Sequence, residues 1–86
     1  MRIIREIRKN RRNRNGLKVG YWEEYYFTNG VLESKGSYVN GLRDGNWEYY
    51  NGDGKLHLKG SFKNDNRYGI WEKYYSNGDI IVIMEI

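Results

Sequence analysis

The sequence has 86 residues, among them three Trp, nine Tyr and eleven Gly, but no Cys and no Pro. A chain of this length buries only about 60% of the surface that it exposes when unfolded, which excludes a two-domain enzyme and leaves little interior for an enclosed substrate cavity. The net charge of +4 is unevenly distributed: residues 1–15 hold seven basic residues and one acid (net +6), whereas residues 16–86 hold eight basic and ten acidic residues (net −2).

The absence of Cys rules out a disulfide framework and favours a cytoplasmic location. The longest apolar run, residues 80–84, is far too short to span a bilayer, and no apolar stretch follows the basic N-terminus as it does in a signal peptide. We therefore expect neither a transmembrane helix nor a signal peptide.

The basic segment, residues 1–18, comes first and is predicted to form a strand over residues 1–9 followed by a loop. Cationic side chains at this density bind phosphates with little sequence specificity, so RNA, DNA, anionic lipid or an acidic protein would each suit it. The structural alternative is a solvated edge strand and loop whose charges block aggregation. No aromatic residue interleaves the charges, so any nucleic-acid contact is expected through the backbone alone. The candidate contact residues are Arg5, Arg8, Lys9, Arg11, Arg12 and Arg14.

Three copies of one pattern follow, at residues 19–42, 43–66 and 67–86. Each copy has a Trp with Gly two positions before it, Glu directly after it and Tyr three positions after it. A turn Gly and an aliphatic residue follow, and the first two copies then contain Gly-Ser-aromatic. The repeated Trp residues are Trp22, Trp47 and Trp71.

The Gly residues also mark the turns. Seven of the eleven follow Asn or Asp, and these dipeptides favour tight turns because both residues tolerate positive φ. The segments between them are rich in Tyr, Trp, Val, Ile and Phe, which favour strands. The predicted strands cover residues 1–9, 19–27, 31–39, 45–50, 55–63, 69–75 and 79–86.

These strands predict an all-β fold, a single antiparallel meander sheet of about seven strands. The whole chain, residues 1–86, would be one domain built from three β-hairpin repeats with a half-repeat at each end. In the alignment of the N-terminal half-repeat, Met1 takes the position of Leu32 and Arg5 that of Gly36.

The G-x-W-E-x-Y-Y-x-x-N-G pattern around Trp22, with its partners at Trp47 and Trp71, resembles MORN repeats, and in particular the variant in bacterial antitoxin and immunity-like proteins. The resemblance covers residues 15–80. It implies a hairpin array that serves as a protein-binding scaffold, with some members linked to membrane lipids and bacterial variants often described as antitoxins. It implies no catalytic motif.

The two faces of the sheet are predicted to differ. Because Glu follows Trp, it points to the opposite side of the strand, so the Trp side chains are assigned to packing. Glu and Tyr then share the other face, where Glu pairs with Lys35 and Lys59 or forms an acidic, aromatic surface for a protein partner. The candidate interface residues on this face are Tyr25, Glu48, Tyr50 and Tyr74.

Catalytic and metal sites have little support in the sequence. The only His is His57, which lies in a predicted strand and is interpreted as a surface residue. Residues 51–54 lack the later Glu of a calcium loop and are interpreted as a hairpin turn. The repeated Glu residues are equivalent, which argues against an acid–base pair with separated pKa values. We expect no catalytic residue, no metal and no cofactor.

Within the last predicted strand, residues 79–86, the segment 80–86 is almost uncharged. An edge strand of this kind pairs readily with another chain, so Val82 and Met84 are candidate interface residues for a homodimer or for a target strand.

Together these observations predict a non-enzymatic binding protein that inhibits a larger protein stoichiometrically, the target being a nuclease or nucleoprotein. An antitoxin or immunity protein and a phage inhibitor of a CRISPR-type nuclease fit equally well. The alternative is a MORN-type structural or membrane-associated adaptor held on anionic lipid by the basic segment; we favour a protein partner over a membrane.

Overall fold

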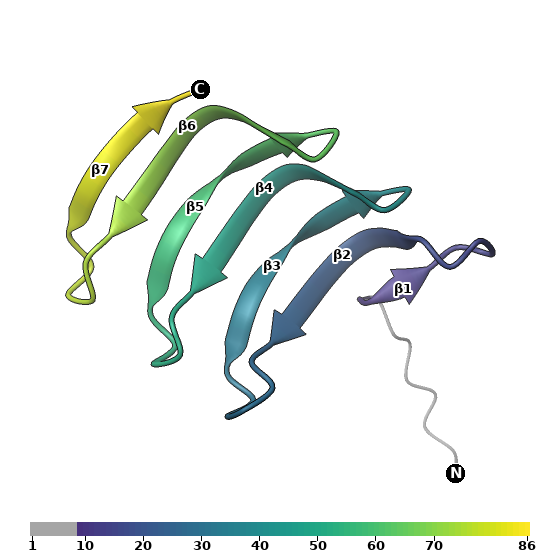
Figure 1. Cartoon of the computed structure of the whole chain (residues 1–86), viewed down its shortest axis with the longest axis horizontal. Coiled ribbons are helices and arrows are strands. Elements are labelled where there is room, and N and C mark those ends of the chain that lie inside the picture. The colour runs from purple at the N-terminus through teal and green to yellow at the C-terminus, as the bar shows by residue number, and fades with distance from the viewer. Residues whose placement is uncertain (1–8) are drawn as a thin grey trace, which may run out of the picture.

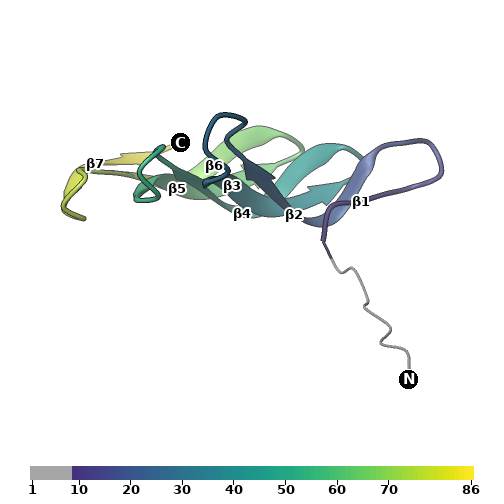
Figure 2. The same cartoon turned by 90° about the horizontal axis from the view of Figure 1, so that it is seen from below.

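The computed structural model describes residues 9–86 and contains one antiparallel sheet, in which the strands lie in chain order from β1 to β7 (Figure 1). Figure 2 shows that these strands form a single twisted layer. The all-β meander predicted from the sequence is therefore confirmed. The strands are β1 (Arg11–Arg12), β2 (Lys18–Tyr25), β3 (Leu32–Val39), β4 (Leu42–Tyr50), β5 (Leu56–Lys63), β6 (Asn66–Tyr74) and β7 (Ile80–Glu85).

The turns between β3 and β4 and between β5 and β6 are shorter than predicted. Asn40 and Gly41 both have positive φ, 47° and 83°, and Asn64 and Asp65 repeat this at 49° and 69°. Two successive residues of this kind form the hairpin turn that best matches the twist of a sheet. As a result β4 and β6 each begin three residues earlier than predicted, at Leu42 and Asn66.

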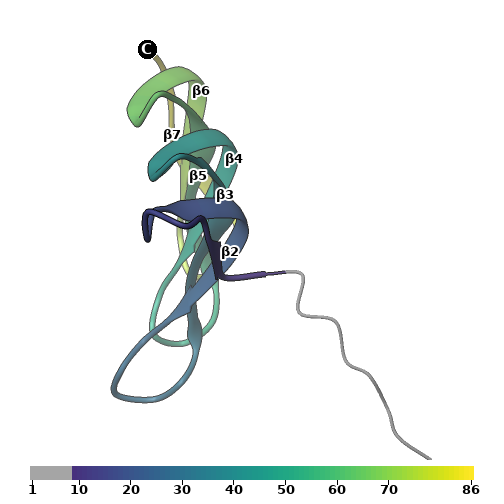
Figure 3. The same cartoon turned by 90° about the vertical axis from the view of Figure 1, so that its right-hand side faces the viewer.

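The Asp44-Gly45 dipeptide was predicted to form a turn, and that prediction is wrong. Both residues lie inside β4, where residues 45–47 stand opposite Gly36 alone. Gly45 has a φ of 86°, a left-handed conformation that glycine adopts without strain. The extra residues form a bulge that bends the strand. Figure 3 shows the resulting arch repeated in β2, β4 and β6.

The bulge places each Trp ring over the neighbouring strand. A Cβ atom added to Gly36 would lie 2.2 Å from Cδ2 of Trp47, and one added to Gly60 would lie 2.1 Å from the same atom of Trp71. Each indole Nε1 then donates a hydrogen bond to the next backbone carbonyl, at 3.0 Å to Ser37 and 3.1 Å to Ser61. Trp47 and Trp71 are only 1% and 0% exposed.

These rings belong to a row of aromatic side chains that forms the core. Successive rings meet edge to face, with centroids 5.0–6.2 Å apart. This geometry is favoured by the aromatic quadrupole. The assignment of the three Trp residues to packing is confirmed. The row runs Trp22, Tyr38, Trp47, Phe62, Trp71.

The N-terminal half-repeat differs from its prediction. Strand 1–9 lies outside the described residues except for Lys9, which is not in a strand. Trp22 donates its Nε1 hydrogen bond to the carbonyl of Arg11, at 2.9 Å. Because Trp47 donates the equivalent bond to Ser37, Arg11 takes the position of Ser37 in the repeat. The alignment that placed Arg5 at Gly36 is therefore wrong by five residues.

Asn10 accounts for the shortness of β1. Its side-chain amide accepts a hydrogen bond from the backbone N–H of Glu23 and donates one to the carbonyl of the same residue, at 2.8 and 2.9 Å. A side chain thus satisfies groups that a longer β1 would have paired. Across residues 9–86, no helix is long and apolar enough to cross a membrane.

Candidate functional site: the Glu–Tyr–Lys face

The side of the sheet opposite the Trp rings carries a regular array of charged and phenolic side chains, which we call the ladder face. In each repeat Glu follows the buried Trp and alternation along the strand turns it outward. Tyr two residues later points the same way. The antiparallel pairing of neighbouring strands places these side chains in adjacent rows. The members of the ladder face are Glu23, Glu48, Glu72, Tyr25, Tyr50, Tyr74, Lys35 and Lys59.

Ion pairs link the rows across the strands, which was one of the two alternatives considered for Lys35 and Lys59. The Nζ atom of Lys35 lies 3.3 Å from Oε1 of Glu48, and that of Lys59 lies 3.8 Å from Oε1 of Glu72. Solvent-exposed pairs of this kind contribute about 0.2–1 kcal/mol each. The pairs therefore orient the side chains more than they stabilise the fold.

Tyrosine hydroxyl groups hold the carboxylates in place. Tyr25 donates a hydrogen bond to Oε1 of Glu23 at 2.5 Å, and Tyr50 donates one to Oε1 of Glu48 at 2.8 Å. Hydrogen bonds from Lys9, Tyr25 and Tyr21 lower the pKa of Glu23 to about 2. Burial would raise the pKa of Glu48, but hydrogen bonds from Tyr50 and Lys35 outweigh it and the pKa is lowered. Both carboxylates are thus held in the charged form.

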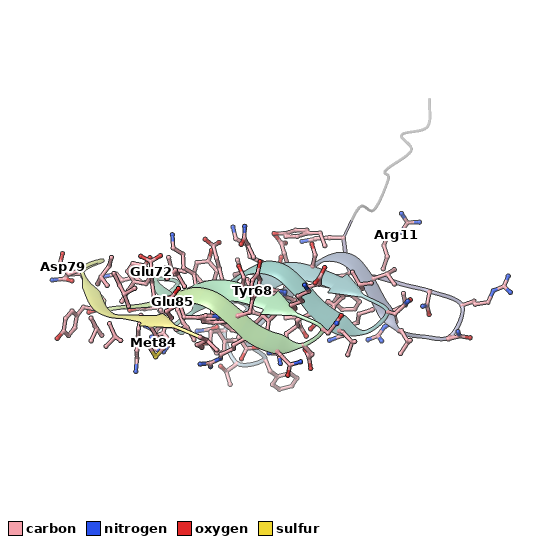
Figure 4. The ribbon with its side chains drawn as sticks, turned by 90° about the horizontal axis from the view of Figure 1, so that it is seen from above. Arg11, Tyr68, Glu72, Asp79, Met84 and Glu85 are labelled. Carbon is pink, nitrogen blue, oxygen red and sulfur yellow. The ribbon has the colours of Figure 1, made fainter. Side chains whose placement is uncertain are left out.

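The basic segment joins the ladder face at its first row. Lys9 forms an ion pair with Glu23 and donates a hydrogen bond to the Tyr25 hydroxyl at 2.9 Å. Figure 4 shows Arg11 on the same side of the sheet as Glu72. Arg11 is exposed, as is Arg14 in the turn before β2. Lys9 and Arg11 therefore lie on the same side of the sheet as the ladder.

Arg12 is placed differently from its neighbours. Its guanidinium lies over the Trp22 ring, 5.0 Å from the centroid, and donates a hydrogen bond to the carbonyl of Gly16 at 2.8 Å. It covers the end of the aromatic row on the opposite face. Of the predicted contact residues, Arg5 and Arg8 lie outside the described residues.

A second set of cations was missed by the sequence analysis. Lys18, Arg43 and Arg67 each stand four residues before a Trp, and each lies over an aromatic ring at 4.0–5.1 Å from the centroid. Arg43 also forms an ion pair with Asp65 at 2.5 Å. The regular spacing of these basic residues is the signal that would have found them.

These cations line two open grooves on the Trp side of the sheet, of about 590 and 580 Å³. Both grooves include Arg43, Asp65 and Tyr49, and the second also includes His57, which is half-buried rather than fully exposed. Among residues 9–86, no group of three His, Cys, Asp or Glu side chains converges on a metal position.

The two predicted interface residues of β7 occupy different environments. Val82 is 40% exposed, whereas Met84 packs against the aromatic core opposite Trp71. Figure 4 shows Met84 on the side of the sheet away from Glu72.

The fold and the repeated ladder define the class of the protein: an open array of β-hairpin repeats in which aromatic rings pack on one face and charged and phenolic side chains cover the other. Residues 18–40, 43–64 and 67–85 match the MORN repeat variant family. The chain belongs to the MORN repeat variant family. No curated protein and no solved structure matches it.

Proposed function

We propose that the protein is a non-catalytic binding protein that holds a larger protein partner against the ladder face. The observation that carries the proposal is the contact of Lys9 with Glu23 and Tyr25, because it joins the basic segment to the repeated Glu–Tyr–Lys array in one surface. Tyr is enriched at protein interfaces, where it supplies contact area at low entropic cost.

The packed aromatic row and the open grooves support a binding role. The aromatic row packs over the strands on one face of the sheet, and the two grooves on that face are open. The three ladder carboxylates take equivalent positions in the repeat, and the pKa values of Glu23 and Glu48 are both lowered, whereas acid–base catalysis needs two groups whose pKa values are shifted apart. This arrangement favours recognition over chemistry.

The exposed cations of the basic segment indicate the nature of the partner. Arg11 and Arg14 are exposed and suited to phosphate or to an acidic protein surface, while the ladder itself presents alternating charges. We propose a partner that handles nucleic acid, inhibited when the protein covers its working surface. An antitoxin and an inhibitor of a defence nuclease would use the same surface.

Affinity capture of the tagged protein from lysate of its source organism, with and without nuclease treatment, tests the proposal. A stoichiometric protein partner that survives nuclease, and whose nucleic-acid-directed activity falls when purified protein is added back, is the expected result. Capture lost on nuclease treatment would instead indicate nucleic acid as the ligand, and retention only on anionic vesicles would indicate the lipid adaptor.

Matched variants localise the surface. Tyr25→Ala together with Tyr50→Ala should abolish capture, while Tyr75→Ala, which removes an exposed ring outside the ladder, should leave it intact. Circular dichroism controls for folding. Equal capture by the ladder variant and the control would contradict the assignment of the ladder face.

A further inference from the structure

The outer edge of β7 differs from the opposite edge of the sheet. Within residues 9–86, β7 pairs only with β6 (Figure 1), and its exposed side chains include Ile81, Val82 and Ile83. At the other edge, β1 is two residues long and both are Arg. Charge and short length protect an edge against pairing, whereas a long apolar edge is a template for another strand. The two edges are thus not equivalent.

The backbone of β7 leaves hydrogen-bonding groups available along this edge. Ile86 exchanges two hydrogen bonds with Gly69, at 2.9 and 3.2 Å. In an antiparallel pair such residues alternate with residues whose N–H and C=O groups point the other way. By this alternation the backbone N–H and C=O groups of Met84 and Val82 point toward β6, whereas those of Ile83 and Glu85 point away from the sheet.

The sequence of β7 excludes a further Trp-bearing strand on this edge. Met84 stands opposite Trp71, as Gly60 stands opposite Trp47. At Gly60 the next strand lays its Trp ring so close that an added Cβ would meet it at 2.1 Å. A Met at the equivalent position leaves no room for such a ring.

A second change removes the partner that the next ladder row would need. Ile83 stands opposite Glu72 just as Lys59 stands opposite Glu48 in the preceding hairpin. Lys59 also stands opposite Glu72 on the next strand, so Ile83 takes the position of a Lys that joins two rows. Ile83 is 60% exposed and offers no charge to a carboxylate on an added strand. The strand that fits this edge is therefore apolar and carries neither Trp nor Glu at the facing positions.

We infer that β7 pairs with β7 of a second copy of this chain, antiparallel and about a two-fold axis at Ile83. In this register Ile83 meets its own equivalent, Val82 meets Met84, and Glu85 meets Ile81, so no like charges stand opposite each other. A symmetric register centred on Val82 would place Asp79 opposite Glu85, which is unfavourable, and one centred on Met84 would pair only residues 82–86, whereas the register centred on Ile83 pairs residues 80–86. Charge and the number of paired residues thus favour the register centred on Ile83.

The dimer would be one continuous sheet. Residues directly opposite each other in paired strands project from the same face, so the two ladder faces would lie on the same side. The pairing does not depend on the proposed function, but it would give a partner two copies of the ladder in one surface.

The oligomeric state of the 86-residue chain tests this inference. Sedimentation velocity over a concentration series should show a species of twice the 10.3 kDa chain mass, which Ile83→Lys should convert to monomer. The new Lys restores the residue that the repeat uses at this position and faces Glu72 within the monomer, so folding should be retained. At the dimer axis it would oppose its own copy.

Ile70→Lys is the matched control, because Ile70 is 52% exposed on β6 and lies away from the edge. This variant should remain dimeric. A monomeric parent chain, a dimeric Ile83→Lys variant or loss of the dimer in both variants would each overturn the inference.

A covalent probe reports the register independently of affinity. The chain has no Cys, so Ile83→Cys introduces a single thiol. Hydrogen-bonded antiparallel pairs place Cα atoms about 5.5 Å apart, within the range that a disulfide bridges. Mild oxidation should cross-link Ile83→Cys into a dimer but leave Ile70→Cys monomeric on a denaturing gel. Equal cross-linking of the two would exclude pairing at Ile83.

Discussion

Replacing Gly60 by Ala tests the idea that each Trp ring needs a bare backbone on the preceding strand. The added Cβ would lie 2.1, 2.2 and 2.5 Å from three atoms of the Trp71 ring, far inside van der Waals contact. Trp71 is 0% exposed and meets Phe62 at a centroid distance of 5.1 Å. The ring therefore cannot turn aside without disturbing the core.

Overpacking of a close-packed core typically costs about 1–3 kcal/mol, and we expect Gly60→Ala to lie at or above the upper end because backbone and ring meet directly. The total stability of a domain is about 0.05–0.15 kcal/mol per residue, so this loss is a large fraction of it. Urea denaturation followed by Trp fluorescence and circular dichroism gives the value.

Gly52→Ala is the matched control for this prediction. A Cβ at Gly52 would meet only Nδ2 of Asn29, at 3.8 Å, and the residue does not have positive φ. Reduced entropy of the unfolded chain should make this variant neutral or more stable by about 0.4–1 kcal/mol. If the two Ala variants were equally stable, the Trp-over-Gly packing would be refuted.

Trp71→Ala should lower the free energy of unfolding by about 3–5 kcal/mol, measured by urea denaturation; a loss below 1 kcal/mol would contradict the role of the ring in the core. The pKa of Glu23 is lowered from 4.5 to about 2 in the folded protein, so its stabilising contribution is complete above about pH 4.5 and is lost as the pH falls through about 2; Glu23→Gln should flatten the decline of stability over that window, and an unchanged slope would contradict the assignment. Deletion of residues 43–66 should leave a shorter folded sheet with a smaller denaturant m-value, because Trp71 would then lie over Gly36; deletion of residues 43–62, which breaks the period, should not fold.

The repeat pattern was sufficient to predict the sheet because its determinants are local. Trp, Glu and Tyr at fixed spacing specify which side chains share a face, since alternation along a strand has a period of two. The same rule predicted the ladder face, on which pairing of Glu with Lys35 and Lys59 was one of two alternatives. Neighbouring rows then follow from hairpin topology alone.

Features set by contacts between strands were not predicted. Asp44-Gly45 has the sequence of a turn, but the fit of Trp47 over Gly36 holds it inside a strand as a bulge. The position of β1 likewise depends on where the Trp22 indole finds a carbonyl, and that carbonyl belongs to Arg11. Both outcomes depend on packing across the sheet, which spacing along the chain does not encode.

The site was predicted in part for the same reason. Tyr25 and Glu48 lie on the ladder face because of alternation, whereas the division of the basic segment depends on tertiary contacts. Lys9 turns to the ladder, while Arg12 covers Trp22 on the other side. Nothing in the local sequence distinguishes these two cations, because each is one of several in a charged run.

Each repeat packs its Trp ring over the preceding repeat and offers a bare Gly to the ring of the next one. A further copy could therefore extend the array unless the residues at the ends of the sheet break this pattern. At one end Arg12 pairs with Lys18, as Tyr38 pairs with Arg43, and its charge closes the aromatic row. At the other end Met84 replaces the required Gly and closes the row with an apolar side chain instead. A charged residue at the end of the row repels another strand. An apolar residue still accepts a strand without Trp, because within residues 9–86 the outer edge of β7 pairs with no other strand. The Met that ends the aromatic row therefore prevents a further Trp-bearing strand from adding to β7 but leaves this edge available for pairing with an apolar strand.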